Sequence, residues 1–301
     1  MGTPQRKLHS LESVVAACAL FFVLAISVGF AQAGSGKSVF LRSSSALVQD
    51  VETGDVVIDK NSDAVVPIAS ITKLMTAMVI LDRGLDLQQR IVLSREDIGS
   101  VKVTRSRLRT GTALTREELL MVALMASENR AAAALGRTYP GGLPAFVTAM
   151  NAKAETLGMT DSHFAEPTGL SPANVASARD LAKLVRAAHA YPLIREYSTR
   201  GKARVMSFRR PLNLVNTNAL VHSSYWEIDL SKTGYISQAG RCLVMHVRMA
   251  DKDLIVVLLN SWSKRSRIGD ANRIREWLEK HIELTASAAD SSSRIGKIAQ
   301  R

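Results

Sequence analysis

The stretch Pro67-Ile68-Ala69-Ser70-Ile71-Thr72-Lys73-Leu74-Met75-Thr76 opens a helical pattern that is apolar at most positions from Ile71 to Leu81. Gly84 marks the end of the pattern. Residues three apart on a helix share a face, with Cβ atoms about 5–6 Å apart. The sequence therefore predicts that the Lys73 amine reaches the Ser70 hydroxyl at the start of a buried helix.

A serine paired with a lysine can act as a nucleophile only if the amine is free to accept a proton. The pKa of Lys73 must then fall from about 10.4 towards roughly 7 to 8, through burial and a second nearby cation. The pattern therefore predicts another lysine in the site. The first turn also supplies backbone N–H groups and the helix dipole, which stabilise a negatively charged oxygen.

The same spacing occurs at Ser261-Trp262-Ser263-Lys264. It follows an apolar strand, lies in a polar and basic turn, and has no apolar helical pattern behind it. We interpret this second match as chance.

Outward from the central helix, the chain is rich in strands at both ends and helical between them. Two β-rich runs, Ala46–Val51 and Asp55–Asp59, flank Glu52-Thr53-Gly54 and predict a hairpin. The expected helices are 115–125 with a capping box at Thr115, 131–137, 143–157, 178–190 capped by Ser177, and 270–284. The expected later strands are 203–208, 226–230, 242–249 and 254–260. One sheet built from the two ends of the chain, with a separate helical lobe, fits this order.

The first residues have the pattern of an export signal. Arg6 and Lys7 precede an apolar run from Val14 to Ala31, and Ala31-Gln32-Ala33 offers a small-residue cleavage site. We expect a cleavable signal peptide over residues 1–33 and a periplasmic protein, with retention as a membrane anchor as the alternative. Cleavage would remove Cys18 and leave Cys242 without a disulfide partner.

Composition excludes several classes of protein. The 301 residues are 47% hydrophobic, 22% charged and 5% aromatic, with two cysteines, which excludes a disordered polyelectrolyte, a fibrous repeat and a disulfide scaffold. The 39 Lys and Arg against 27 Asp and Glu give a net charge of +12. An anionic partner or surface is expected.

Two further triplets carry candidate chemistry. Ser127-Glu128-Asn129 lies at a predicted helix junction, and Lys232-Thr233-Gly234 leads into Tyr235 on a predicted strand. Ser and Asn at a junction are commonly caps, whereas Gly inside a strand marks close approach by another backbone or a ligand. Lys232 is the predicted second cation.

These three patterns in this order resemble those of the penicillin-recognising serine enzymes, with their S-x-x-K, S-x-N and K-T-G motifs. The longer strings 67–76 and 232–243 are similar to those of the D-alanyl-D-alanine carboxypeptidase and endopeptidase family, particularly its penicillin-binding protein 7 type. The resemblance spans roughly residues 40–284. It implies an α/β, β-lactamase/transpeptidase-like fold with an antiparallel five-stranded sheet flanked by helices and an all-helical lobe at about 84–199. The corresponding domain is 34–284, followed by a disordered Ser- and Ala-rich tail, 285–301.

The resemblance also implies residue roles. Ser70 would attack a D-alanyl peptide bond, Lys73 would take its proton and Ser127 would relay a proton to the leaving amine. The substrate-binding residues would be Asn129, Lys232, Thr233, Gly234 and Tyr235, with the backbone N–H groups of Ser70 and Tyr235 holding the oxyanion. Peptidoglycan or muropeptide would be the substrate, β-lactams would be covalent inhibitors, and no cofactor or metal is expected. Glu128 departs from the Asp of many relatives, but it is assigned no proton transfer.

Several alternatives stay open. A D-alanyl-D-alanine carboxypeptidase would use the same residues as the endopeptidase. A serine β-lactamase of class A needs a deacylating glutamate, for which Glu166 is the candidate, although its surroundings favour a structural role. The lack of an obvious strand-rich domain after Leu284 favours the endopeptidase.

A different class of hypothesis is a non-catalytic basic protein that binds the cell wall. The basic runs are 102–109 and 264–267, but no aromatic residues interleave them, so no nucleic-acid partner is expected. The charge favours peripheral contact with an anionic wall or membrane surface, and we expect a monomer. Six histidines show no ligand spacing.

Overall fold

The computed structural model describes the backbone of residues 39–98 and 106–298, and side-chain surroundings up to residue 281. The predicted signal peptide, 1–33, lies outside the described residues, as do Lys102 and Arg105 of one basic run. Among the helices that the structure describes, none combines the length and apolar character needed to cross a bilayer.

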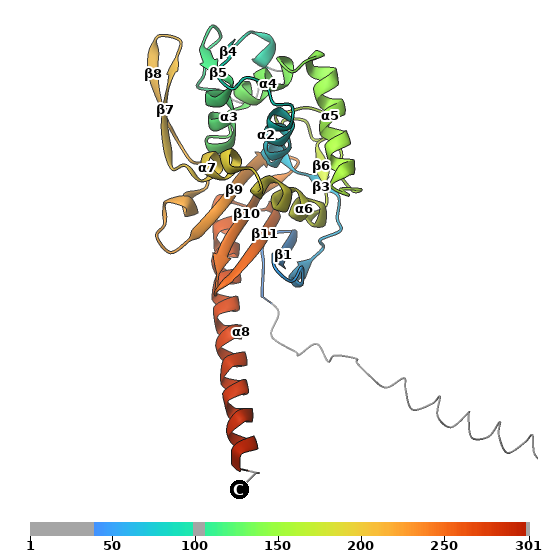
Figure 1. The fold of residues 1–301 in the computed structure, drawn as a ribbon, viewed down its shortest axis with the longest axis vertical. Coiled ribbons are helices and arrows are strands. Elements are labelled where there is room, and N and C mark those ends of the chain that lie inside the picture. The colour runs from blue at the N-terminus through green and yellow to red at the C-terminus, as the bar shows by residue number, and fades with distance from the viewer. Residues whose placement is uncertain (1–38, 99–105, 299–301) are drawn as a thin grey trace, which may run out of the picture. The chain divides into compact units, whose positions relative to one another are not determined.

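A five-stranded antiparallel sheet joins the two ends of the described chain, in the order β2-β1-β11-β10-β9 (Figure 1). Its strands are β1 Ser45–Asp50, β2 Val56–Lys60, β9 Glu227–Ile236, β10 Gly240–Met249 and β11 Lys252–Ser261. The hairpin predicted at the start of the chain is confirmed, because β1 pairs antiparallel with β2. Strand β9 lies at one edge of the sheet.

The two faces of the sheet pack against different helices, as the alternation of side chains along a strand requires. On β10, Cys242 and Val244 join the larger hydrophobic core, which contains the helices of the middle of the chain. Leu243, Met245 and Val247 point to the other face and pack with α8. The sheet thus separates two hydrophobic cores.

The pairing of β9 with β10 is interrupted once. Ile228 lies opposite Val247 and Leu230 lies opposite His246, so Asp229 has no partner in the register. Beyond such a bulge, the side chains of the strand that would have faced one side of the sheet face the other side. Accordingly, Ile228 packs on the α8 side of the sheet, and Leu230 belongs to the other core.

The helices confirm the predicted class of fold. They are η1 Ala69–Ile71, α2 Thr72–Asp82, η2 Glu96–Ile98, α3 Arg116–Met125, α4 Asn129–Arg137, α5 Gly142–Thr156, α6 Ala178–His189, α7 Pro192–Thr199, η3 Ala219–His222 and α8 Lys264–Ile298. The capping box of α3 is present: Thr115 accepts a hydrogen bond from the backbone of Glu118, whose carboxylate accepts one from the backbone of Thr115. Ser177 caps α6 as predicted.

Several small elements were not predicted. The lobe also holds the two-stranded pairs β3–β6 and β4–β5, with strands β3 Val66–Pro67, β4 Arg90–Val92, β5 Ala113–Thr115 and β6 Val175–Ala176. The predicted strand 203–208 is present as β7 Lys202–Ser207, but it pairs with the unpredicted strand β8 Arg210–Val215 and not with the five-stranded sheet. Helix α7 starts at Pro192, a residue tolerated at the first helical position, where its missing N–H is not needed. Strands of two or three residues are too short to show a period of two.

The last helix is longer than the predicted 270–284. It begins at Lys264 and continues to Ile298, so the backbone of 285–298 is helical where composition predicted a disordered tail. This segment contains no proline and a single glycine, Gly296, so nothing in it forces the helix to stop. The division into a signal, a domain of 34–284 and a tail stays a prediction.

Candidate active site

Ser70 lies in the short helix η1, where the backbone is held in an unusual conformation. The preceding residue, Ala69, has a positive φ of 48°, which is rare for a residue with a side chain. Gly169, with a φ of 78°, approaches so closely that a Cβ there would lie 1.9 Å from the carbonyl oxygen of Ala69. Glycine is required at 169, and its backbone packs directly behind the Ser70 turn.

The Lys73 amine lies one turn further along the chain and contacts Ser70. Lys73 Nζ donates to Ser70 Oγ at 2.8 Å and to Asn129 Oδ1 at 2.7 Å, and it also bonds the carbonyl oxygen of Thr168. Its residue is 1% exposed. The structure therefore brings together two of the three predicted motifs around one buried amine.

Burial alters the ionisation of this amine. It lowers the pKa of Lys73 from 10.5 to about 8, although the carboxylates of Glu166 and Glu128 act in the opposite direction. An amine with this pKa is partly unprotonated near neutral pH. It can then accept a proton from the hydroxyl at 2.8 Å.

The predicted second cation is Lys232 on β9. Its Nζ donates to Ser127 Oγ at 2.9 Å and to the carbonyl oxygen of Thr233 at 2.9 Å. Burial lowers the pKa of Lys232 well below its ordinary value, and repulsion from Lys73 and Arg267 lowers it further. Burial, and not the second cation that the sequence predicted, is the cause of the lowered pKa of Lys73, whereas Lys73 does act on the pKa of Lys232.

Gly234 allows β9 to pack against the Ser70 turn. A Cβ at this position would lie 3.0 Å from Ala69 Cβ and 3.1 Å from the backbone nitrogen of Ser70. The neighbouring Thr233 hydroxyl bonds that of Thr217 at 2.7 Å. Close approach of another backbone is what glycine inside this strand predicted, and it is present.

Ser127 and Asn129 do not cap the helix α4; the residue between them does. The Glu128 carboxylate accepts hydrogen bonds from the backbone N–H of Arg130 and from the Ser106 hydroxyl. Ser127 has a positive φ of 57°, which leaves its hydroxyl next to Lys232. The Glu128 side chain is therefore engaged in the local structure, while its two neighbours contact the lysines.

Glu166 has the structural surroundings that its sequence context favours. Its carboxylate accepts from the backbone N–H groups of Thr168 and Ser171 and from the Asn174 amide. These bonds brace the loop whose Thr168 carbonyl contacts Lys73.

A cavity of about 460 Å³ opens beside Ser70 and is lined by residues of all three motifs. Its lining also includes four cationic residues that the sequence analysis did not assign to a site: Arg107, Arg241, Lys264 and Arg267. The Arg241 guanidinium lies 3.5 Å from the ring centroid of Tyr235, which is half exposed. This side of the site is suited to an anionic group.

The burial of Arg267 could have been predicted from the spacing of apolar residues in α8. It is 4% exposed and donates to the carbonyl oxygen of Cys242 at 2.9 Å. The buried stripe Ala271, Ile274 and Leu278 of α8, extended back by one turn, reaches position 267. Helical spacing therefore places this arginine on the buried face, although its basic neighbours suggest a solvated run.

The alternative Ser-Lys match has no such arrangement. Ser261 is fully buried and bonded to Ser43, while Lys264 is the first residue of α8. A helix with a buried face does follow the motif, contrary to the expectation of a turn alone. The hydroxyl nevertheless pairs with another serine, so the interpretation of chance agrees with the contacts.

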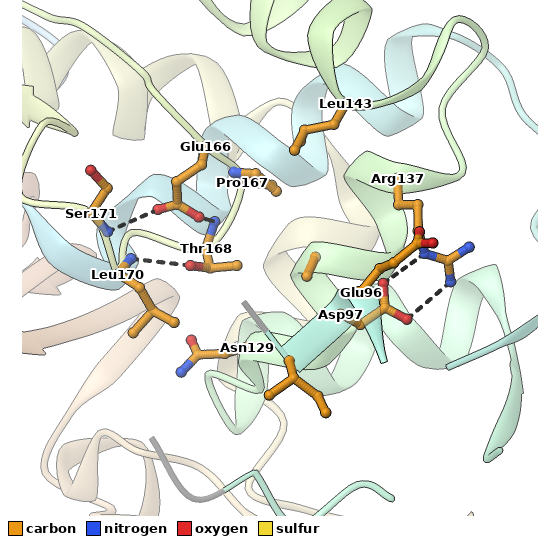
Figure 2. A pocket seen from close by; sticks show the side chains of 12 residues that line it. Glu96, Asp97, Asn129, Arg137, Leu143, Glu166, Pro167, Thr168, Leu170 and Ser171 are labelled. Carbon is orange, nitrogen blue, oxygen red and sulfur yellow. Dashed lines mark hydrogen bonds and ion pairs between the residues drawn. The ribbon is translucent and has the colours of Figure 1, made fainter. Parts of the chain in front are cut away.

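A second cavity, of about 380 Å³, lies on the other side of Asn129. Figure 2 shows the braced Glu166 loop on one of its sides and the ion pair between Arg137 and Asp97 on another. Asn129 lines both cavities. The two cavities therefore share the asparagine that bonds the Lys73 amine.

Comparisons with known proteins agree with this geometry. A family model described as D-alanyl-D-alanine carboxypeptidase matches residues 32–263. The chain is 44% identical over 264 residues to a D-alanyl-D-alanine endopeptidase of Pseudomonas aeruginosa, covering 87% of this chain and 85% of the relative. It is 43% identical over 263 residues to the Escherichia coli protein of the same name, covering 86% and 84%. The crystal structure of a Streptomyces DD-transpeptidase has a TM-score of 0.74 at 26% identity, covering 80% of this chain and 98% of that one.

Proposed function

The chain belongs to the D-alanyl-D-alanine carboxypeptidase family of serine peptidases, and from this premise we propose that it acts as an endopeptidase on peptidoglycan. It is a serine D,D-peptidase. The specific reaction is hydrolysis of the D-alanyl cross-link between two peptide chains. The observation that carries the proposal is the buried Lys73 amine, with its lowered pKa, 2.8 Å from the Ser70 hydroxyl.

In the acylation step, unprotonated Lys73 removes the proton of Ser70 as its Oγ attacks the carbonyl carbon of the D-alanyl residue. Backbone N–H groups of Ser70 and Tyr235 stabilise the oxyanion. Collapse of the tetrahedral intermediate breaks the peptide C–N bond. The leaving amine takes a proton through Ser127, whose hydroxyl is in contact with Lys232.

In the deacylation step, water attacks the ester carbon and releases Ser70. Lys73 is neutral again once its proton has passed to the leaving amine, so it takes a proton from the attacking water and returns it to the departing Ser70 Oγ, which restores the starting state. Asn129 holds the Lys73 amine by its 2.7 Å hydrogen bond in both steps. The family reaction needs no metal in this scheme, because the Ser70–Lys73 pair supplies both nucleophile and base.

The cationic cavity supports recognition of a carboxylate on the leaving group. Thr233, Arg241 and Arg267 line the same cavity as Ser70, and Lys232 contacts Ser127 of that lining. A carboxylate beside the scissile bond would form charge-assisted hydrogen bonds there. Such a group occurs both in a terminal D-alanine and in a cross-linked residue, so this feature alone is neutral between carboxypeptidase and endopeptidase.

Two observations favour the endopeptidase. The cavity on the β9 side, at about 460 Å³, falls in the range of about 300–1,000 Å³ that holds drug-sized ligands, so it has room for more than one alanine. The two relatives above carry the endopeptidase name at 44% and 43% identity.

β-Lactams are proposed as covalent inhibitors that acylate Ser70. Rapid release of the adduct, as in a β-lactamase, would need a base poised for water. Glu166 is bonded to two backbone N–H groups and one amide, which supports its role as a brace.

We further propose that the protein is exported by residues 1–33 and works as a monomer in the periplasm, where its excess of Lys and Arg over Asp and Glu favours contact with anionic wall or membrane surface. Binding to purified sacculi should then weaken steeply with added salt. Retention that is independent of salt would contradict the electrostatic part of this proposal.

The activity is tested with two substrates in parallel. Purified protein is incubated with cross-linked muropeptide dimers and with a monomer ending in D-alanyl-D-alanine, and products are separated by mass. Conversion of dimers to monomers, absent in Ser70→Ala, is the expected result. Release of D-alanine alone would replace the endopeptidase with the carboxypeptidase, and no cleavage of either would refute both.

A further inference from the structure

Three metal-ligand side chains converge at a place that the peptidase site does not use. They are His189 at the last residue of α6, Asp229 in β9 and His246 in β10. One ligand atom from each lies within 4.8 Å of the other two. None of the three lines the cavity beside Ser70.

The distances suit coordination better than hydrogen bonding. His189 Nε2 lies 3.7 Å and His246 Nδ1 lies 3.6 Å from Asp229 Oδ2, which is too far for a hydrogen bond. Tetrahedral Zn²⁺ with bonds of about 2.0–2.1 Å holds its ligand atoms roughly 3.3–3.4 Å apart. A shift of a few tenths of an ångström would therefore close these two contacts around an ion.

The second observation is that the two ring nitrogens lack hydrogen-bond partners among the described residues. Both His189 Nε2 and His246 Nδ1 are buried and accept or donate no hydrogen bond among the described residues. The His246 side chain is only 5% exposed. A buried polar atom without a partner is costly and uncommon, and coordination to a cation would satisfy both nitrogens at once.

The local fold supplies the convergence. The bulge in β9 leaves Asp229 without a partner in the ladder, and a bulge commonly re-aims a side chain. His246 points to the same face of the sheet as α6, and its ring stacks on that of His189 with centroids 3.7 Å apart. Two elements distant in sequence and the edge strand therefore meet at one point.

Burial disfavours the charged form of both rings, and the Asp229 carboxylate acts in the opposite direction on the pKa of each. Burial lowers the pKa of His246, with repulsion from His189 acting in the same direction. Burial also lowers the pKa of His189, with Arg195 adding to the effect.

We propose that His189, Asp229 and His246 form a binding site for a divalent transition metal, with Zn²⁺ as the expected ion and water as its fourth ligand. Two imidazoles and one carboxylate select Zn²⁺ over Mg²⁺ and Ca²⁺, which prefer oxygen ligands. The rings lie nearly parallel, 11° apart, so they must open toward the ion. His189 has the freedom to do so, because its side chain is 29% exposed at the end of α6.

A bound ion would tie the end of α6 to β9, the strand that carries Lys232. Asp229 is three residues before that lysine. The site would therefore stabilise the edge strand without contacting substrate. This inference is independent of the proposed endopeptidase activity, since metal binding is measured without any muropeptide.

The test is equilibrium dialysis of the purified protein against buffered ZnCl₂, followed by metal analysis. Asp229→Asn and His189→Gln remove one ligand each at exposed or partly exposed positions, and His163→Gln is the matched control at an exposed histidine. We expect one Zn²⁺ per chain in the unaltered protein and in the control. Loss of a direct ligand should weaken binding by at least the roughly 10–100-fold that changes around a metal site cost.

A second measurement reports on the same site through stability. Zinc at about a hundredfold above its dissociation constant should raise the melting temperature by roughly 5–10 °C, and should do so much less in the two ligand variants. Cobalt(II) should give the visible absorption of a tetrahedral complex. Absence of stoichiometric zinc, or equal binding by Asp229→Asn, His189→Gln and the unaltered protein, would overturn the proposal.

Discussion

Two clusters of buried polar groups meet the two halves of β9, and they differ in their hydrogen bonds. From Lys232 onward, the buried amines have acceptors: Lys232 bonds Ser127, and Lys73 bonds Ser70 and Asn129. Around Asp229, the buried ring nitrogens of the histidine pair have no hydrogen-bond partner among the described residues.

This difference in hydrogen bonding distinguishes a site whose groups are already positioned for a reaction from a site whose ring nitrogens need a ligand. In the first, the hydrogen bonds hold the reacting groups in place before substrate arrives, as preorganised catalysis requires. In the second, the unsatisfied nitrogens keep an energetic cost that an ion would remove. Hydrogen-bond satisfaction thus distinguishes two clusters that burial alone would class together.

The largest expected effect follows from removing the nucleophile of the hydrogen-bonded cluster around Lys73 and Lys232. Ser70→Ala should reduce muropeptide cleavage by at least about a thousandfold and abolish covalent labelling by penicillin, because no other hydroxyl contacts Lys73 in the described structure. Activity and labelling are followed by mass spectrometry. Ser237→Ala, at an exposed serine of the turn after β9, is the matched control and should keep both.

The next effect tests the ionisation of the amine. Lys73→Arg keeps the charge but cannot lose its proton, so cleavage should fall by roughly 10²–10⁴-fold. In the unaltered protein, kcat/KM should rise with pH through about 8, as Lys73 becomes the free base. A rate that is flat between pH 6 and 9, by contrast, would argue against Lys73 as the base.

The same ionisation predicts a change in stability. Between about pH 8 and 10.5 the unfolded chain keeps a proton on Lys73 that the folded chain has lost, so the contribution of this group to stability rises with pH. The free energy of unfolding of the unaltered protein relative to Lys73→Met should therefore increase over this range, by on the order of 3 kcal/mol. Urea titrations at several pH values measure it.

A smaller effect tests how tightly the Ser70 turn is held. Gly169→Ala would place a Cβ 1.9 Å from the Ala69 carbonyl oxygen, whereas Gly54→Ala has the same backbone conformation with nothing within 4 Å. We expect a loss of about 2–4 kcal/mol for the first and about 1 kcal/mol for the second. Equal losses in denaturant titrations would show that the contact with Ala69 relaxes without cost.

The smallest expected change in stability comes from the cluster of His189, Asp229 and His246, whose ring nitrogens have no hydrogen bond among the described residues. In zinc-free buffer, His246→Leu should change stability by less than about 1 kcal/mol, because an apolar side chain replaces a nitrogen that has no hydrogen bond. Asn218→Leu, at a fully buried amide that bonds Ser231, should cost about 1–3 kcal/mol. The comparison fails if both variants lose the same stability.

Much of the fold could be predicted because the relevant signals are local. The capping box at Thr115, the cap at Ser177 and the turn at Gly54 each involve residues a few positions apart. The reach of Lys73 to Ser70 is likewise one helical turn. In all these cases the contact lies within the span that periodicity can detect.

The predicted strand 226–230 and the strand predicted around Tyr235 are one continuous strand, β9, whose second half serves the site. The segment Ser231-Lys232-Thr233-Gly234 has no apolar alternation, yet it pairs with β10 as far as Ile236. Because polar residues face the active site here, this segment lacks the alternation of apolar and polar residues from which a strand is predicted.

The histidine cluster could not be predicted, since it depends on tertiary contacts. Residues 189 and 246 are distant in sequence and show no ligand spacing, and the third member is exposed. Only the stacking of α6 on the sheet reveals them as neighbours.

The unpaired residue at position 229 also fixes which way the rest of the edge strand faces. Because the bulge reverses the alternation, Ile228 reaches the core beneath α8 while Leu230 and the following Lys232 share the opposite side. Deleting residue 229 would restore regular pairing between β9 and β10. Either Ile228 would then face the other core, or Lys232 would point away from Ser127. An insertion or deletion at position 229 should therefore be tolerated far less than a substitution of its side chain.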